Sequence, residues 1–547
     1  MSPRRLGRLL AAYAALVFVL VVSMRARYSI AAVDGPVIAS VWQRGRLVAR
    51  AELPKADILG TPLDGVPGTV VYEHVVGTAP VLRIHPITAA LSFVPGRDGV
   101  RVTIDGKSTV LTPDDLLALQ AYDHGVQIDA LTLGIGLDLA VVSAVAASRL
   151  GANPADVEER AQLERVRTER TVPSLPKPRR IDAETLTDAD LRAGIAAAAG
   201  YLARGMSADG HYRYLVDAAK NEAKPGYDWP RHAGTTLFVA QAGRLLGDGV
   251  LKMSALQSAD LLRSSGLKAC GAYKCIGDGD TFEIGSAALA VMAFAEIASS
   301  NLDPSYVPLV RDLADFLLSQ QRPDGDFMHQ VTTSGQRIDV QFLYFSGEAA
   351  LALARAHALL GDAKYLDGAS RALARLVGSA WSFFGNRYYF GEEHWTCQTM
   401  GELWDRAPDP KALDFCLRWL AYSRAQQQHE GDSLFDGDGA YQVGTVVTPR
   451  LTPAASRCEA GVATLAAAEK AGVDPAERAR LREQLRRSFA LLLRHQLPGS
   501  SAHLMADPGA VAGAIPGSDV DWALRIDYAQ HAGAAMVRWL ELPPPPL

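Results

Sequence analysis

The stretch from residue 228 to residue 248 reads DWPRHAGTTLFVAQAGRLLGD and holds the main clue to the fold. Arg231 and His232 stand near its start, small and apolar residues follow, and Gly247 is a typical stop signal for a helix. A helix that is apolar on nearly every face is typically enclosed by other helices. The stretch therefore predicts a buried helix with a polar pair at its entry.

Related stretches recur along the chain. HAGTTLFVAQ aligns with IGSAALAVMA, SGEAALALAR, RCEAGVATLA and HAGAAMVRWL, and HWTCQTMGELW fits less cleanly. Helices are expected to start near Asp188, Arg231, Met253, Ile284, Tyr306, Ser346, Lys364, His394, Lys411, Ser456, Ala476 and Tyr528. They form pairs whose second members are rich in small residues and begin roughly 50–70 residues apart, whereas tetratricopeptide and ankyrin arrays repeat about every 34 residues. Six helical hairpins with enclosed inner helices predict a mainly α fold, an (α/α)6 toroid.

The segment YFSGEAALALARAHALLGDAKYLDGASRALARLV, residues 344–377, joins two helical patterns through a Gly-Asp turn and a Tyr-Leu pair. This form and the repeated inner-helix stretches resemble the six-hairpin glycosidase-like superfamily over residues 188–541. That superfamily includes glycoside hydrolases, uronic-acid lyases and sugar epimerases. The resemblance implies a carbohydrate-active protein, but it selects no reaction, because one fold supports many.

Acidic residues at the starts of the inner helices are candidates for catalysis, since these helix ends converge on one funnel in a toroid. Glycoside hydrolysis normally uses two carboxyl groups, one protonated and one ionised. Glu283 and Glu348 are predicted as this pair, with Asp527 or Glu459 as substitutes. The structural alternative for each acid is a favourable charge at a helix N-terminus or an ion pair with an arginine.

Histidine, arginine and aromatic residues at the same mouth support a second hypothesis. Lyases and C5-epimerases of uronic acids abstract a proton next to a carboxylate, and His232, Tyr344 and His531 are candidates for this acid–base work. An excess of arginine would suit an anionic sugar. The residues expected to bind substrate are Arg231, Trp229, Tyr344, His394, Trp395, Arg457 and Tyr528. A third hypothesis is a non-catalytic toroid that binds a glycan or a protein.

Glycine-aspartate loops occur at residues 277–280, 322–327 and 436–441. Their spacing does not match an EF-hand, and they are interpreted as tight turns, so no metal and no cofactor is expected. The recurrence of HAG at residues 531–533 predicts that the sixth hairpin closes beside the first. His232 and His531 are then expected on adjacent inner helices at one height.

Residues 1–29 are predicted to anchor the chain in a membrane. Arg4, Arg5 and Arg8 precede an apolar run from Leu9 to Met24. This run is somewhat shorter than the roughly 20 residues that span a bilayer comfortably, and no small-residue cleavage site follows it. An uncleaved anchor is expected, with the domains facing the periplasm or the cell exterior.

Residues 30–168 are predicted to form a small α+β domain, with strands up to about residue 112 and a last helix over about 154–167. A linker at 169–187 and a Pro-rich tail at 542–547 are also expected. The formal net charge of −5 gives no support to a nucleic-acid partner.

The five cysteines divide into two groups. Cys270 and Cys275 lie close together in a loop and are predicted to form a disulfide in an exported protein. Cys397, Cys416 and Cys458 fall in helical stretches and are expected to be buried and unpaired.

Overall fold

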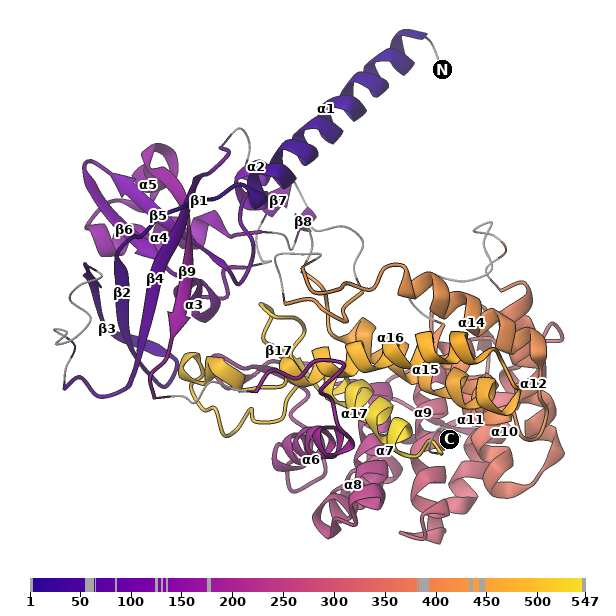
Figure 1. Ribbon diagram of the computed structural model, residues 1–547. Helices are drawn as coiled ribbons and strands as arrows, with labels where there is room; N and C mark the ends of the chain where they lie inside the picture. The colour runs from indigo at the N-terminus through magenta and orange to yellow at the C-terminus, as the bar shows by residue number, and fades with distance from the viewer. Residues whose placement is uncertain are drawn as a thin grey trace.

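The computed structural model describes residues 3–54, 63, 65–83, 86–122, 126–128, 131–133, 136–174, 179–380, 382, 393–431, 436–441 and 448–543. It begins with helix α1 (Pro3–Tyr28), which projects away from two folded domains (Figure 1). Arg27 fixes the end of this helix, because its guanidinium donates a hydrogen bond of 2.7 Å to the carbonyl of Phe93. No helix within the described ranges combines the length and apolar character needed to cross a membrane. The anchor predicted for residues 1–29 is not confirmed.

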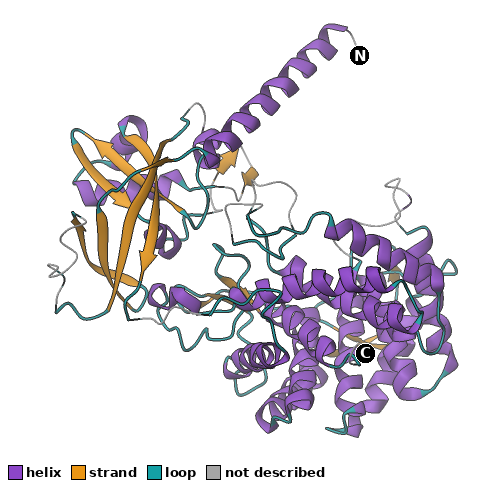
Figure 2. Ribbon diagram, in the orientation of Figure 1, coloured by secondary structure: helices purple, strands orange, loops and turns teal. Residues whose placement is uncertain are grey.

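The first domain is built on a seven-stranded antiparallel sheet with strand order β3-β2-β4-β9-β5-β6, and β1 pairs with β4 (Figure 2). Its strands are β1 (Ala31–Ala32), β2 (Val37–Gln43), β3 (Arg46–Leu53), β4 (Thr69–Pro80), β5 (Asp98–Ile104), β6 (Lys107–Leu111) and β9 (Gln162–Thr171). Helices α2 (Pro86–Leu91), α3 (Pro113–Ala118), α4 (Leu139–Leu150) and α5 (Pro154–Arg160) and the short pair β7 (Val126–Ile128) and β8 (Leu131–Leu133) complete it. Strands β2 and β3 form a hairpin that turns at Arg44 and Gly45.

The helix expected over residues 154–167 is wrong in its second half, where the chain forms strand β9. This strand pairs with β4 on one side and β5 on the other, and Val166 is fully buried. Sheet pairing outweighs local helical propensity there, because a central strand satisfies its backbone on both edges. The strand continues to Thr171, past the domain boundary placed at residue 168.

The second domain contains twelve helices in its described residues: α6 (Asp188–Arg204), α7 (Trp229–Leu246), α8 (Gly249–Leu261), α9 (Ile284–Ser299), α10 (Val307–Gln320), α11 (Phe345–Leu360), α12 (Ala363–Gly378), α13 (His394–Leu403), α14 (Pro410–Arg424), α15 (Thr452–Lys470), α16 (Pro475–Arg494) and α17 (Ile526–Leu540). The inner helices contact one another in the order α7, α9, α11, α13, α15, α17, and α17 returns to α7. The even-numbered helices pack outside this closed ring. The predicted (α/α)6 toroid and its closure are confirmed.

Short strands join the loops that lead into the inner helices. They form the sheets β10 (Leu215–Asp217), β11 (Glu222–Ala223) and β17 (Ala523–Arg525); β12 (Leu267–Cys270) and β13 (Tyr273–Ile276); and β14 (Thr281–Glu283), β15 (Gln330–Thr332) and β16 (Arg337–Ile338). The pairing of β10 with β17 ties the loop before α7 to the loop before α17. At its mouth, the ring of helices is therefore joined between the first and the last hairpin by backbone hydrogen bonds as well as by helix packing.

Small residues allow the inner helices to pack closely. A Cβ atom on Gly533 would lie 2.0 Å from the Phe238 ring, and one on Gly234 would lie 2.7 Å from the Gln530 amide. The same contacts set the register of α7 against α17. They place His531 about one helical turn further along the shared direction than His232, so the two histidines lie on adjacent helices but at different heights.

The structure contains two disulfides. Cys270–Cys275 joins β12 to β13 and confirms the predicted pair. Cys397–Cys416 joins inner helix α13 to outer helix α14, so the prediction of unpaired cysteines at these two positions is wrong. Cys458 is buried and unpaired, as predicted. Both members of the second pair lie inside regular helical patterns, which carry no signal that two cysteines face each other.

Removing the second disulfide with Cys397→Ala/Cys416→Ala should lower the free energy of unfolding by about 3 kcal/mol, because this cross-link closes a longer loop in the unfolded chain than the first one does. The matched control, Cys270→Ala/Cys275→Ala, also removes two buried, disulfide-bonded cysteines and should cost about 2 kcal/mol. Urea denaturation without reductant measures both. An unchanged denaturation midpoint in the Cys397→Ala/Cys416→Ala protein would contradict a disulfide between these two residues.

Candidate active site

Each inner helix brings one polar side chain to the mouth of the toroid. They are Arg231 on α7, Glu283 at the start of α9, Glu348 on α11, His394 on α13, Glu459 on α15 and His531 on α17. All six were singled out from the sequence. The charges of Arg231, Glu283 and His531 all act on Glu348, so these groups share one site.

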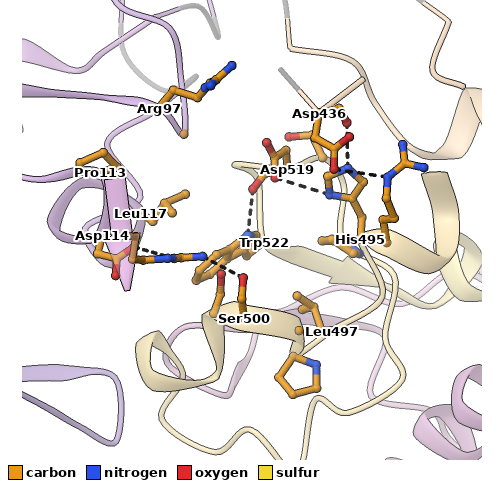
Figure 3. Close-up of a pocket in the computed structure, with 18 of the residues that line it drawn as sticks. Arg97, Pro113, Asp114, Leu117, Asp436, His495, Leu497, Ser500, Asp519 and Trp522 are labelled. Carbon is orange, nitrogen blue, oxygen red and sulfur yellow. Dashed lines mark hydrogen bonds and ion pairs between the residues drawn. The ribbon is translucent and has the colours of Figure 1, made fainter. Parts of the chain in front are cut away.

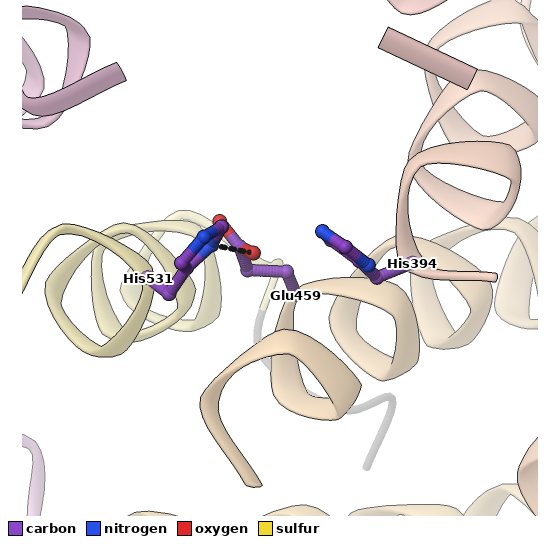
Figure 4. A group of neighbouring side chains, drawn as sticks. All are labelled: His394, Glu459 and His531. Atoms are coloured by element: carbon purple, nitrogen blue, oxygen red, sulfur yellow. Dashed lines mark hydrogen bonds and ion pairs between the residues drawn. The ribbon is translucent and has the colours of Figure 1, made fainter. Parts of the chain in front are cut away.

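Two histidines and one glutamate form the most compact part of this ring (Figure 4). The ligand-type atoms of His394, Glu459 and His531 all lie within 4.8 Å of one another. His531 Nδ1 lies 2.8 Å from Glu459 Oε2, and the carboxylate can only accept this hydrogen bond unless it is protonated. The Glu459 carboxylate therefore keeps Nδ1 of His531 protonated, and Nε2 is the atom of His531 that can accept a further proton.

His394 completes the cluster from the next inner helix. Its ring packs edge-on against His531 with 5.6 Å between centroids, and Trp395 lies 4.7 Å from it. Burial, together with the nearby charges of His531 and Arg457, lowers the pKa of His394 well below its ordinary value. The imidazole of His394 is therefore neutral at physiological pH.

Glu348 is the carboxyl group with the most perturbed environment at the mouth. It is only 5% exposed, and no described residue hydrogen-bonds its Oε2. Burial raises the pKa of Glu348 to about 8, partly opposed by His531. Glu348 is thus mostly protonated at pH 7 and can donate a proton or a hydrogen bond. Glu283 is half-buried, and burial also raises its pKa.

Asp527 is held differently from the other acids. Arg525 contacts both of its oxygens at 2.6 and 2.8 Å, and Arg231 Nε lies 3.4 Å away. Arg231 also pairs with Asp228 at 2.5 Å. These ion pairs make Asp527 and Arg231 parts of a structural network at the α7–α17 seam.

His232 faces away from the funnel, although it follows Arg231 directly in the chain. Its Nε2 donates to the carbonyl of Ser258 on outer helix α8 at 2.9 Å, and Nδ1 accepts a hydrogen bond of 2.6 Å from the Tyr227 hydroxyl. Burial lowers the pKa of His232 to about 4. Its geometry is that of a neutral core histidine with both nitrogens satisfied.

The residues predicted to bind substrate fall into two groups. Tyr344 and Trp395 border the histidine cluster, with ring centroids 5.9 Å from His394 and 6.0 Å from His531 respectively. Trp229, Arg457 and Tyr528 are engaged by other partners. Trp229 Nε1 donates to Asp278 at 2.5 Å, Arg457 lies over the Tyr441 ring at 4.7 Å, and the guanidinium of Arg525 lies over the Tyr528 ring at 4.8 Å.

Gln398 is a site residue that the sequence reasoning missed. It lies four positions after His394 on α13, hence on the same face of that helix. It is buried, and neither atom of its amide has a hydrogen-bond partner among the described residues. The available signal was a polar residue inside an otherwise enclosed helix.

The cluster of His394, Glu459 and His531 also has the composition of a metal site, because two imidazoles and one carboxylate are ligands that catalytic zinc uses. The prediction of no metal was based on the glycine-aspartate loops and did not consider these three residues together. The short contact between His531 and Glu459 favours an acid–base pair, since one proton already lies between the two groups.

Comparisons with known proteins agree with this architecture. The chain is similar to the structure of a cellobiose 2-epimerase from Bacillus thermoamylovorans, with 11% identity, coverage of 65% of this chain and 98% of the other, and a TM-score of 0.50. The toroid has the six-hairpin glycosidase-like fold. A D-mannose isomerase (13% identity, TM-score 0.48) and an unsaturated glucuronyl hydrolase specific for heparin (12% identity, TM-score 0.47) also match, each over 65% of this chain and 98% of its own. No protein-family model and no curated protein matches the sequence. At these identities the likeness concerns the fold alone.

Proposed function

We propose that the toroid is a carbohydrate-active enzyme that moves a proton at the carbon next to a sugar carbonyl, as in the isomerisation of an aldose to a ketose. The observation that carries this proposal is the convergence of His394 and His531 around Glu459. General acid–base chemistry on carbon needs a positioned base and a hydrogen-bond donor for the oxygen that gains charge. Both kinds of group are present at the mouth of the ring.

His531 is the proposed base. Its Nε2 takes the proton from carbon, and the Glu459 carboxylate on Nδ1 stabilises the imidazolium that forms. His394 stays neutral and hydrogen-bonds a sugar oxygen without adding charge. Glu348, which holds its proton up to about pH 8, donates to the oxygen of the enediolate.

The spacing of the two imidazoles favours proton transfer on one face of the substrate. Their centroids are 5.6 Å apart in edge contact, which leaves no room for a sugar between them. The imidazoles of His394 and His531 must then both contact the substrate from the same side. One base that removes and returns a proton on one face fits an isomerase.

A second candidate is glycoside hydrolysis by Glu348 as acid and Glu283 as base. It is favoured by one observation: neither carboxyl group forms an ion pair with a described arginine or lysine, whereas Asp527 pairs with two arginines. A protonated and an ionisable carboxyl group at one mouth are the elements such a mechanism requires.

Turnover in deuterium oxide separates the two candidates. We expect glucose, mannose or cellobiose incubated with the full-length protein to gain solvent deuterium at C2, detected as loss of the C2 proton signal by NMR. Hydrolysis would release new reducing ends from an oligosaccharide without this exchange. Pretreatment with a chelator should leave the exchange rate unchanged, and a chelator-sensitive rate would instead assign His394, Glu459 and His531 to a metal ion.

The proposal includes a location outside the reducing cytoplasm. Two disulfides in one chain support it, because such bonds persist in oxidising compartments. Attachment to a membrane through residues 1–29 belongs to the same proposal and rests on the flanking arginines and the apolar run between them.

A further inference from the structure

A cavity of about 340 Å³ lies where the sheet domain meets the toroid (Figure 3). Glu73, Arg97 and Asp114 line it from the sheet domain, and Asp519 and Trp522 line it from the loop that precedes α17. Small-ligand sites occur preferentially at such domain boundaries and start at about 300 Å³. The cavity is separate from the cluster of His394, Glu459 and His531, whose residues do not line it.

The walls of the cavity are fixed by contacts between the domains. Arg170 donates hydrogen bonds of 2.8 Å to both Asp114 in its own domain and Ser500 in the toroid. His503, also in the toroid, lies 2.6 Å from the other oxygen of Asp114, and both groups are buried. The backbone of Gly45 packs so closely on residues 504–506 that a Cβ atom there would lie 2.9 Å from Ala506 N. These contacts hold the two domains in a fixed arrangement around the cavity.

Charged groups in the wall are matched with one another. His495 lies 3.5 Å from Asp519, and Arg494 lies 3.3 Å from Asp436. Burial lowers the pKa of Arg97, and the negative charge of Asp519 partly opposes this shift. Together with the Arg170–Asp114 pair, these contacts leave no large excess of one sign, so the wall suits an uncharged ligand with many hydrogen-bonding groups.

Glu73 and Trp522 give the cavity its chemical character. Glu73 is 1% exposed, and none of the described residues hydrogen-bonds its Oε2. Burial and the neighbouring Asp114 raise the pKa of Glu73 well above its ordinary value and so favour its protonated form, which can donate a hydrogen bond. The indole of Trp522 is held by a 3.1 Å hydrogen bond from Nε1 to the carbonyl of Asp519. The flat indole of Trp522 suits the apolar face of a sugar ring, and the carboxyl group of Glu73 suits its hydroxyl groups.

We infer that this cavity binds one neutral sugar residue of an oligosaccharide whose reacting end lies in the toroid funnel. Trp522 stands directly before β17, and the chain then runs through Asp527 to His531. Arg450 links the loop that carries Trp522 to the start of α17, since it pairs with Asp521 at 2.5 Å and donates to the Tyr528 hydroxyl at 3.3 Å. The inference rests on the proposed action on carbohydrates, and it assigns the sheet domain the role of holding the non-reacting part of the chain.

Calorimetric titration of the full chain tests the inference with cellotetraose, mannotetraose and maltotetraose as neutral probes and tetragalacturonate as the anionic one. The titrations use the His531→Ala background, so binding is measured without turnover. We expect a neutral tetrasaccharide to bind, and Ser501→Trp, which fills the cavity, to weaken that binding at least tenfold. Ser305→Trp, at an exposed position on another part of the toroid, is the control and should bind like its parent.

Glu73 provides an independent variant in case Ser501→Trp fails to fold. Glu73→Leu should weaken the same tetrasaccharide roughly tenfold, and Glu73→Gln, which keeps a donor, should stay within about twofold of the parent. Equal affinities for the Ser501→Trp and Ser305→Trp proteins, binding of tetragalacturonate alone, or no binding of any neutral probe would overturn the inference. Failure of deuterium exchange with intact, cavity-dependent binding would overturn only the proposed reaction.

Discussion

Replacing His531 with alanine should reduce kcat for the exchange reaction by roughly two to four orders of magnitude, because a positioned general base contributes about that much. His531 is partly buried and its Nδ1 is fixed by Glu459, so the substitution removes a base that is already held in position. NMR exchange rates measured at saturating sugar give the change in kcat. Circular dichroism and the denaturation midpoint establish that the ring stays folded.

His357→Ala is the matched control for this experiment. His357 lies near the end of inner helix α11 and contacts the carbonyl of Asp362 through Nδ1 at 3.0 Å, away from the mouth. Its loss should leave the exchange rate within about twofold. Glu459→Gln keeps a side chain in contact with Nδ1 but loses the charge, so a smaller fall in kcat with little change in KM is expected. A His531→Ala protein that exchanges deuterium at the wild-type rate would remove His531 from the mechanism.

The order of helices was accessible from the sequence because small residues repeat on every inner helix. Starts expected near Ile284, Ser346 and His394 agree with α9, α11 and α13. This agreement reflects packing: an inner helix needs small residues on several faces, and such a pattern is visible without tertiary information. The closed contact order from α7 to α17 then follows from the number of hairpins.

The direction of individual side chains was not accessible in the same way. Arg231 and His232 are adjacent in sequence, but successive helical residues point about 100° apart, and only Arg231 reaches the mouth. His394 stands on the helix that fitted the repeat least well, and α13 is also the shortest inner helix in the described chain. Its partners Glu459 and His531 come from distant segments. The three residues meet because α13, α15 and α17 are neighbours around the ring, and the packing of these helices decides which of their side chains face one another.

Glu348→Gln should make the protein more stable while it impairs the reaction. The ordinary pKa of 4.5 is raised to about 8 in the folded protein, so the native state retains a proton that the unfolded chain loses over this range. The stabilising contribution of this proton linkage is fully present below about pH 4.5 and is lost as pH rises through about 8. Glutamine is neutral at every pH and avoids this loss.

The expected gain in the free energy of unfolding is on the order of 5 kcal/mol at pH 9 and near zero at pH 4. Urea denaturation at pH 4, 7 and 9 measures it. Glu296→Gln is the control, because Glu296 is an equally buried inner-helix acid but pairs with Arg244 at 2.7 Å, so its substitution should destabilise at pH 7 and 9. A Glu348→Gln protein that is less stable than wild type at pH 9 would contradict a protonated Glu348.

The same substitution separates the catalytic role of Glu348 from its effect on folding. If the Glu348 proton serves the enediolate oxygen, the wild-type exchange rate should fall as pH rises through about 8, where that proton is lost. The Glu348→Gln protein keeps a weaker amide donor, so its rate should be lower at pH 7 but should show no such fall. A purely structural Glu348 would leave the descending limb in place after substitution. We therefore expect the Glu348→Gln protein to be more stable, to exchange more slowly at pH 7 and to show no fall in rate above pH 8. These three results together would show that the buried carboxyl group of Glu348 lowers the stability of the fold and serves the reaction.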